Sequence, residues 1–325
     1  MQTEFLISAG EQPKRLDLFL VNREPKLSRS AVQRLISAGR VRVNDVSAKS
    51  SQKIKSGDVI SLDSPKPAPL LVDGQPTRLD ILFEDSTCLV VNKPAGVAAH
   101  PGPGHWDDTL LNALLDHAGR AGAEAMRGLV HRLDKDTSGV MVVAKTREAH
   151  GRLAAQFEQH SIIRQYEALV HGVPEPCQGM IELALGTDRR NLKRTSANTQ
   201  FPKAAVTGYR VERPFGAAAA HLVLMPRTGR THQIRAHLQA IGHPILGDSM
   251  YGPISSCHPA ITAVPRVMLH ARILGFAHPL TKIYCEFTAN APADFQTLYD
   301  ALRGTALHEE PRESLSGVNR RSFRP

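Results

Sequence analysis

Three prolines at alternate positions, Pro65, Pro67 and Pro69, constrain the organisation of this chain more than any other feature of its sequence. A segment of this kind holds an extended, semi-rigid conformation and cannot join a helix. Because 325 residues correspond to about two domains, we predict a boundary here. The predicted parts are an N-terminal module (1–62), a Pro-rich linker (63–72), a main domain (73–303) and a flexible tail rich in Arg, Glu, Ser and Gly (304–325).

The N-terminal module has the pattern of a short helix followed by two short strands. The helix is indicated by apolar residues at helical spacing, a capping serine and a terminating glycine: Val32, Leu35, Ile36, Ser28 and Gly39. Strands are expected within residues 41–45 and 59–62. The module carries 11 Lys and Arg against 6 Asp and Glu, and Arg29 and Arg34 lie off the apolar stripe. These cations fit an anion-binding face or simply a solvated helix face.

The main domain consists of many short β-type segments and few helices. Strands are expected within residues 81–92, 140–145 and 162–171, and helices at 109–116, 148–159 and 232–241. Because the strands do not alternate regularly with helices, we predict an α+β fold with a mainly antiparallel sheet.

Composition and charge narrow the class of protein. The formal net charge of +9 favours a polyanionic partner, with nucleic acid first, although ordinary basic enzymes share this property. Aromatic residues are only 5% of the chain, so a base-stacking surface must use a few placed rings. The sequence contains no run of about 20 consecutive apolar residues, so it predicts no membrane span. The first residues do not resemble a secretion signal. Four well-separated cysteines fit a reducing compartment, so we predict a soluble cytoplasmic protein.

Residues 128–145 carry the densest group of chemically useful side chains. Two apolar runs flank a polar turn with six such residues: His131, Arg132, Asp134, Lys135, Asp136 and Thr137. A turn between core strands can aim side chains into a cleft, where a lone carboxylate acts as nucleophile or base. A structural interpretation is also open, in which Asp136 or Thr137 closes the turn and Asp134 pairs with a neighbouring cation.

Residues 227–238 predict a second polar cluster at the start of a helix. Thr231 can cap a helix that begins near His232, and helix N-termini attract anions. Arg235 would lie in the first turn, where its charge opposes the helix dipole unless a buried carboxylate meets it. His232 and His237 are about 140° apart around a helix, a poor arrangement for a shared metal, so core or capping roles are favoured.

Two further segments complete the candidate site. Tyr166 alternates with polar neighbours on an expected strand, where packing is the ordinary role of a tyrosine. The segment 188–195 holds four cations that suit phosphate contact, although a solvated loop is the alternative: Arg189, Arg190, Lys193 and Arg194.

Taken together and in order, these segments resemble the RluA branch of the pseudouridine synthases. The resemblance covers most of the chain, from Asn92-Lys-Pro-Ala-Gly through His131–Gly139 and Arg164-Gln-Tyr-Glu-Ala to Gly229-Arg-Thr-His-Gln-Ile-Arg235 and His243-Pro-Ile-Leu-Gly-Asp. Residues 13–62 are similar to a small RNA-binding domain of the S-four type through Arg15-Leu-Asp, Ser28-Arg-Ser and Gly39-Arg-Val-Arg-Val-Asn44. Asp45 departs from the glycine that this domain often has after the asparagine, which affects the geometry of a turn.

The resemblance implies an isomerase that converts uridine in RNA to pseudouridine, with no cofactor and no metal. It implies that Asp134 is the catalytic aspartate, that Arg235 pairs with it and keeps it ionised, and that Tyr166 stacks on the target uracil. Arg132 would fill the space left by the flipped nucleotide. RNA is expected to contact the arginines of the small domain and the cations of the 188–195 segment: Arg29, Arg34, Arg40, Arg42, Arg189, Arg190, Lys193 and Arg194. The implied fold is a mixed, mainly antiparallel sheet with the cleft along its middle.

The expected substrate is large-subunit (23S) ribosomal RNA or the precursor of that subunit, bound by a monomer without membrane contact. Two alternatives use RNA differently: a ribosome assembly factor for which catalysis is secondary, and a related synthase that acts on tRNA. A third hypothesis is a metal-dependent hydrolase that uses His131, Asp134 and Asp136, which would be sensitive to chelators.

Overall fold

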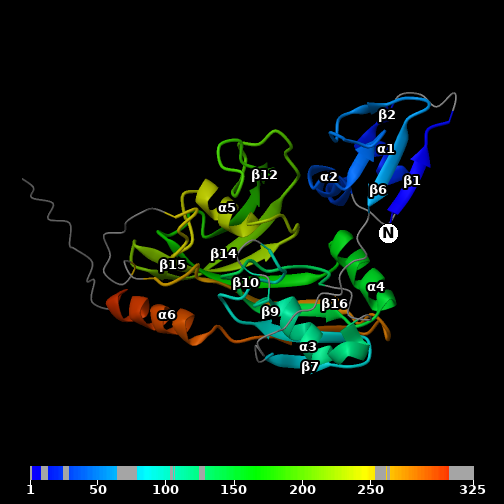
Figure 1. Cartoon of the computed structure of the whole chain (residues 1–325). Helices are drawn as coiled ribbons and strands as arrows, with labels where there is room; N and C mark the ends of the chain where they lie inside the picture. The colour runs from blue at the N-terminus through cyan, green and yellow to red at the C-terminus, as the bar shows by residue number, and fades with distance from the viewer. Residues whose placement is uncertain are drawn as a thin grey trace, which may run out of the picture. The chain divides into compact units, whose positions relative to one another are not determined.

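The computed structural model describes residues 2–8, 14–24, 29–63, 79–102, 105, 107–123, 129–252, 261 and 264–306. The chain divides into two compact units, residues 1–71 and 72–325 (Figure 1). Most of the linker expected at 63–72, the capping residue Ser28 and positions 307–325 of the expected tail lie outside the described residues, as do the side chains of Arg29 and Arg34. Among the described helices, none is long and apolar enough to cross a membrane.

The first unit is a small α+β module. It contains a four-stranded sheet of order β1-β6-β3-β4, a β2–β5 pair and two helices: β1 (Gln2–Leu6), β2 (Lys14–Arg15), α1 (Leu16–Arg23), α2 (Arg29–Ser37), β3 (Val41–Val43), β4 (Val46–Ser47), β5 (Lys53–Ile54) and β6 (Val59–Asp63). Val32 and Ile36 of α2 are buried, as the spacing predicted. Gly39 follows α2 at φ +71°, a conformation that suits glycine at a helix end.

The turn between β3 and β4 accommodates the unusual Asp45. Asn44 and Asp45 have φ values of 51° and 62°, the left-handed region that asparagine and aspartate tolerate better than most residues. The Asn44 side chain holds the turn in place. It accepts a hydrogen bond from the Val59 backbone N–H and donates one to Asp58, both at 2.9 Å.

The second unit is built on one mixed sheet. The strand order is β11-β14-β15-β10-β16-β9-β8-β7, with β17 also paired to β16, and every pairing is antiparallel except that of β16 with β9. The strands are β7 (Ile81–Glu84), β8 (Cys88–Lys93), β9 (Ser138–Ala144), β10 (Ile163–His171), β11 (Gln178–Glu182), β14 (Val206–Phe215), β15 (Ala219–Pro226), β16 (Leu269–Ala277) and β17 (Tyr284–Thr288). A separate hairpin pairs β12 (Gly186–Thr187) with β13 (Thr195–Ser196). The predicted α+β class and mainly antiparallel sheet are confirmed.

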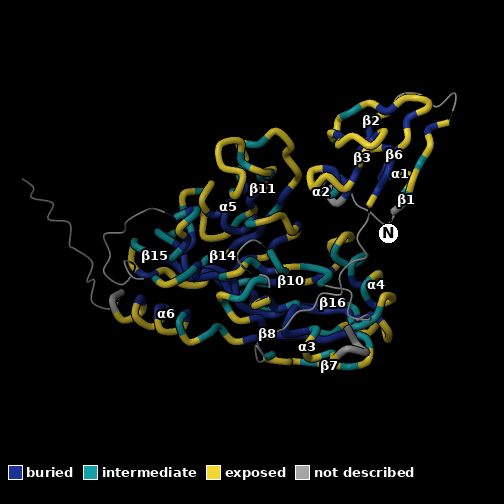
Figure 2. The backbone as a smooth tube through the Cα atoms, viewed as in Figure 1, coloured by how far each residue is buried: buried dark blue, intermediate teal, exposed yellow. Residues whose placement is uncertain are grey.

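Helices cover the two halves of this sheet with separate cores (Figures 1 and 2). The helices are α3 (Leu110–Ala123), α4 (Arg147–Glu158), α5 (Gln233–Ala240) and α6 (Ala293–Ala306). Helices α5 and α6 contribute to the core over β10, β14 and β15, whereas α3 and α4 pack on β8 and β9 in two further cores. Helix α6 was not predicted, and it includes residues 304–306, which the sequence had assigned to the tail.

The junction of the two halves requires a glycine. On β16, Ala271 pairs with Tyr166 of β10 on one side and with Gly139 of β9 on the other. A Cβ atom at position 139 would lie 2.1 Å from the Ala271 carbonyl oxygen, and Gly139 has φ +120°. Only glycine therefore lets β9 approach β16 here. The β10–β16 register also shifts between Gln165 and Tyr166, because Arg272 of β16 has no partner on β10.

Candidate active site

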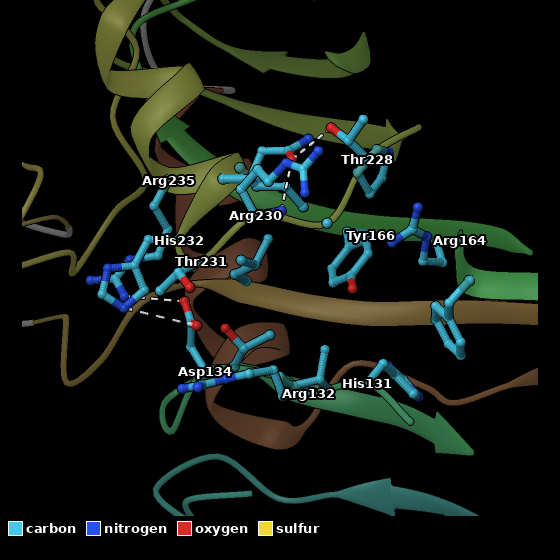
Figure 3. Close-up of a pocket in the computed structure, with 18 of the residues that line it drawn as sticks. His131, Arg132, Asp134, Arg164, Tyr166, Thr228, Arg230, Thr231, His232 and Arg235 are labelled. Atoms are coloured by element: carbon cyan, nitrogen blue, oxygen red, sulfur yellow. Dashed lines mark hydrogen bonds and ion pairs between the residues drawn. The ribbon is translucent and has the colours of Figure 1, made fainter. Parts of the chain in front are cut away.

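A cavity of about 480 Å³ opens at this junction (Figure 3). Its lining comes mainly from the turn before β9, strand β10 and the turn that leads into α5, and the end of α4 and Leu269 of β16 complete it. The principal lining residues are Arg132, Asp134, Thr137, Tyr166, Thr231, His232 and Arg235. The structure therefore brings together the two polar clusters and the tyrosine that the sequence singled out separately.

Asp134 lies in the turn that precedes β9, with 19% of its side chain exposed. The Thr137 backbone N–H closes the turn by donating to the Asp134 carbonyl oxygen at 3.1 Å. Oδ2 of Asp134 accepts a hydrogen bond from Arg235 Nη1 at 3.2 Å. The turn-closing and ion-pairing contacts of the structural interpretation are thus present, and they leave the carboxylate at the wall of the cavity.

Arg235 is held between two carboxylates. Its Nε and Nη2 donate to the two oxygens of Asp248 at 2.7 and 2.9 Å, and its third nitrogen reaches Asp134. Burial lowers the pKa of Arg235, but the hydrogen bonds and charges of the two aspartates outweigh it, so the net shift is upward. The expected carboxylate partner of this first-turn cation is therefore present. In the sequence, Asp248 is the last residue of the motif His243-Pro-Ile-Leu-Gly-Asp, and its spacing gives no indication of this role.

The start of α5 differs from the prediction in one detail. The N-cap is His232, with φ 52° and no side-chain cap bond, and not Thr231. The side chain of Gln233 instead ties the helix to the preceding loop, because its oxygen accepts from the Arg230 backbone N–H at 3.0 Å. Thr231 is consequently exposed at the cavity mouth.

The two histidines of this helix have different surroundings. His237 is a core residue, bonded to Thr207 and to the Leu183 carbonyl, as the sequence favoured. His232 instead lines the cavity, with Nε2 3.9 Å from Asp134 Oδ1 and Nδ1 3.1 Å from the Tyr251 hydroxyl. Burial lowers the pKa of His232 despite the nearby Asp134 charge, so its neutral form is favoured near pH 7.

Tyr166 stands at the opposite wall, with its hydroxyl directed into the cavity (Figure 3). Its ring packs partly against the cores of both sheet halves, so it has the packing role expected of a strand tyrosine as well as an accessible face. Burial raises the pKa of its hydroxyl, which is therefore neutral near pH 7. Thr137 adds a second hydroxyl: its Oγ1 is buried and has no hydrogen-bond partner among the described residues.

Arg132 and His131 are adjacent in sequence, but the first is exposed and the second is packed against Phe157. Arg132 is exposed at the cavity rim and forms no ion pair within the described part of the chain. His131 stacks on Phe157 at 4.5 Å, and its Nε2 accepts from the Val142 backbone N–H at 3.1 Å. Burial lowers the pKa of His131 to about 3. His131 is thus a neutral structural residue, and among the described residues it does not form a metal-binding group with Asp134 and Asp136.

A fully buried lysine supports the turn that carries Asp134. Lys93 Nζ donates to the carbonyl oxygens of Pro94, Val97 and Lys135 at 2.7, 2.8 and 3.0 Å. Burial lowers its pKa to about 7, against the raising effect of Asp136 and Asp134. Lys93 therefore ties the loop after β8 to the residue that follows Asp134. In the sequence, this lysine appears only within the motif Asn92-Lys-Pro-Ala-Gly, to which no role was assigned.

The predicted RNA-binding cations are distributed over both units. Arg189, Arg190 and Lys193 are exposed on the loop that joins β12 to β13, and none forms an ion pair with a described residue. Arg194 differs, because its guanidinium lies over the Tyr251 ring at 4.6 Å. In the first unit, Arg42 is exposed on β3, whereas Arg40 pairs with Asp63 at 3.0 Å on the surface.

Comparisons with known proteins agree with this arrangement. Residues 87–240 match the family described as RNA pseudouridylate synthase, and residues 14–60 match the S4 domain. The chain is 43% identical over 298 residues to the ribosomal large subunit pseudouridine synthase D of Zymomonas mobilis, covering 89% of this chain and 93% of that protein. It is 39% identical over 307 residues to the uncharacterized RNA pseudouridine synthase YlyB of Bacillus subtilis, covering 93% and 98%.

A solved structure shares the fold. Human RNA pseudouridylate synthase domain containing 4 superposes with a TM-score of 0.55 at 26% identity, covering 69% of this chain and 92% of that chain. Fold, site and relatives together define an RNA-modifying isomerase with an accessory RNA-binding domain. The chain belongs to the RluA family of pseudouridine synthases and carries an N-terminal S4 domain.

Proposed function

We propose that this synthase converts specific uridines of large-subunit (23S) ribosomal RNA to pseudouridine, with Asp134 as its catalytic carboxylate and without a cofactor. One observation carries the proposal. A partly buried carboxylate, paired with an arginine that a second carboxylate fixes, lies in one cavity with a half-buried tyrosine. This arrangement supplies an arginine-paired, oriented carboxylate oxygen in the same cavity as a flat apolar ring.

The atom balance of the reaction explains why these groups suffice. The bond between C1′ of the ribose and N1 of uracil breaks, the base turns, and a bond forms between C1′ and C5. One proton leaves C5 and one is gained at N1, so nothing is oxidised or reduced. Asp134 can act on the base, on the sugar carbon or on a sugar proton, and an ion-paired carboxylate suits each of these steps.

Tyr166 and Arg132 have roles in holding the flipped base. Stacking of a base on an aromatic ring contributes about 1–3 kcal/mol, and extrusion of a base from a helix costs a few kcal/mol. Tyr166 offers its ring to uracil inside the cavity, and its hydroxyl is directed toward the same space. Arg132 is exposed at the rim, where a cation can replace the stacking that the flipped nucleotide loses.

Ribosomal RNA as the substrate is supported by the S4 domain and by the name of the Zymomonas mobilis relative. An additional RNA-binding unit is useful on a large structured RNA, where it adds contacts remote from the target uridine. We further propose that the protein acts as a monomer in the cytoplasm, on the large ribosomal subunit precursor.

The test uses the purified full-length protein with transcribed 23S ribosomal RNA and, separately, with tRNA. Pseudouridine formed per mole of enzyme is measured by mass spectrometry for the wild type, Asp134→Asn and the control Asp116→Asn, an exposed residue of α3. Wild type and control are expected to modify the 23S RNA. Asp134→Asn is expected to be slower by about 10²–10⁴-fold. Modification of tRNA alone would contradict the substrate, and full activity of Asp134→Asn would contradict the catalytic role.

A further inference from the structure

A second cavity, of about 690 Å³, adjoins the Asp134 cavity. The two share the turn Gly229, Arg230 and Thr231 as a common wall. We propose that this second cavity binds the nucleotide next to the flipped uridine, with its base stacked on Phe201. This inference rests on the proposed function only in that the Asp134 cavity holds the target uridine.

Phe201 has the properties of a stacking platform. It is 77% exposed, the largest exposure of any aromatic side chain among the described residues, and it lines the second cavity. In the part of the chain that the structure describes, no other ring packs against it. Every base offers a π-face, so an uncovered ring beside a catalytic cavity suits an unpaired nucleotide.

The frame around Phe201 is rigid. Lys203 and Leu185 exchange both backbone hydrogen bonds at 2.9 Å, and the Phe201 backbone N–H donates to Thr199 Oγ1 at 3.3 Å. A Cβ atom at Gly186 would lie 2.5 Å from Thr199 Oγ1 and 2.7 Å from the Phe201 carbonyl oxygen. The glycine therefore permits close packing of the two segments, which holds the backbone that carries Phe201.

Charge at the second cavity favours a phosphate. Arg189, Lys203 and Arg230 line it, and none forms an ion pair with a described residue. The acidic lining residue, Asp188, is already engaged: it accepts from Ser196 Oγ at 2.6 Å and from the backbone N–H groups of Arg190 and Asn191. These hydrogen bonds, first that of Ser196, lower the pKa of Asp188. The Asp188 carboxylate therefore binds groups of its own loop.

The combination of ring, cations and shared wall identifies one class of occupant. A protein partner could cover Phe201 and the exposed Leu192, but it would not explain unpaired cations continuous with a uridine-binding cavity. A single RNA strand crossing the turn at Arg230 leaves one base on each side of it, which matches two cavities with a common wall.

The test compares Phe201→Ala, Phe201→Trp and the control Leu280→Ala, an exposed apolar residue that lines neither cavity. For each variant, binding and modification of one RNA hairpin are measured. The hairpin is taken from a 23S region that the wild type modifies. If the wild type modifies no such region, the hairpin is taken from the RNA that it binds most tightly. The hairpin is made intact and with an abasic site at each neighbour of the target uridine. Phe201→Ala is expected to raise Kd and KM about 5- to 100-fold on the intact hairpin. Phe201→Trp and Leu280→Ala are expected within about threefold of wild type.

The abasic hairpins decide whether the ring meets a base. One of them is expected to weaken wild-type binding by the same factor as Phe201→Ala, and the two changes together are expected to add nothing further. Equal Kd values for wild type and Phe201→Ala, or losses that simply add on every abasic hairpin, would overturn the inference in favour of a protein-docking role. A wild type that binds as expected but forms no pseudouridine would instead overturn the proposed function.

Discussion

Replacing Asp248 by asparagine tests whether the second carboxylate organises the catalytic pair. The side chain of Asp248 is completely buried, and both of its oxygens accept from Arg235. Its Oδ1 also accepts from the backbone N–H groups of Met250 and Tyr251 at 3.0 Å. Asparagine keeps the shape but removes the charge and turns an NH₂ group toward the guanidinium.

The expected loss of stability follows from the burial of this pair. Removing one partner of a buried ion pair costs about 3–5 kcal/mol. Arg235 retains Asp134 as a second carboxylate, so we expect the lower value, about 3 kcal/mol. At about 2–4 °C per kcal/mol for a unit of this size, the Tm falls by about 6–12 °C.

The effect on catalysis is expected in kcat. Asp248 does not line the cavity, so KM stays within about threefold of wild type. An arginine held at one end only orients Asp134 poorly, and misplacement of a catalytic group by about 1 Å costs up to about 10²-fold in rate. We therefore expect kcat to fall about 10- to 100-fold at a temperature where the variant is fully folded.

Thermal melts by circular dichroism and pseudouridine formation under saturating RNA measure the two effects. The matched control is Glu148→Gln, which breaks an exposed ion pair with Arg152 on α4 and should change stability by at most about 0.5 kcal/mol. A lowered Tm with unchanged kcat would refute the positioning role. An unchanged Tm would refute the buried pairing itself.

Three further outcomes follow from the same structure. Tyr166→Phe should keep RNA affinity within about threefold but lower kcat, whereas Tyr166→Ala should also weaken binding about 5- to 100-fold, as filter binding would measure. A wild-type kcat in Tyr166→Phe would contradict a role for the hydroxyl, and equal RNA affinity of the two variants would contradict a role for the ring. Because the pKa of His131 is about 3 folded against 6.5 ordinarily, the unfolded state binds more protons as pH falls below 6.5, and stability is lost in that window. Between pH 7.5 and 5.0 the contribution of His131 amounts to about 2 kcal/mol, so denaturant unfolding should show a loss of stability that is smaller by this amount in His131→Gln than in wild type. Arg42→Ala should reduce the magnitude of the slope of log K for RNA binding against log salt concentration by about 0.7–0.9. Arg210→Ala, which removes a surface arginine already paired with Glu212, should leave this slope unchanged.

Local patterns predicted part of the regular structure and missed β11 and β14 to β17 of the main sheet. The helix at 29–37, the strands β8, β9 and β10, and the helix α5 follow from apolar periodicity within single segments. Helix α6 was missed although Phe295, Leu298 and Leu302 are buried at helical spacing, a signal that was available. The order of strands in the sheet was not predictable, because β16 and β9 pair in parallel across more than 100 residues of sequence.

The residues of the candidate site were likewise predicted only in part. Asp134, Tyr166 and Arg235 were found through ordered motifs and a family resemblance, and the structure brings them to one cavity. Asp248, His232 and Lys93 act through contacts with distant backbone or side chains, so their own neighbours in the sequence carry no sign of the role. Thr231 was assigned as a cap from residue type, but the backbone at His232 adopts a left-handed conformation that displaces the cap by one residue.

The central claim is that Asp134 makes this chain a synthase for large-subunit ribosomal RNA. The most direct test is pseudouridine mapping in total RNA from cells that lack the protein, rescued with wild type or with Asp134→Asn. The account predicts that specific large-subunit uridines lose modification and that only wild type restores them. Full restoration by Asp134→Asn, or persistence of every large-subunit site without the protein, would contradict it.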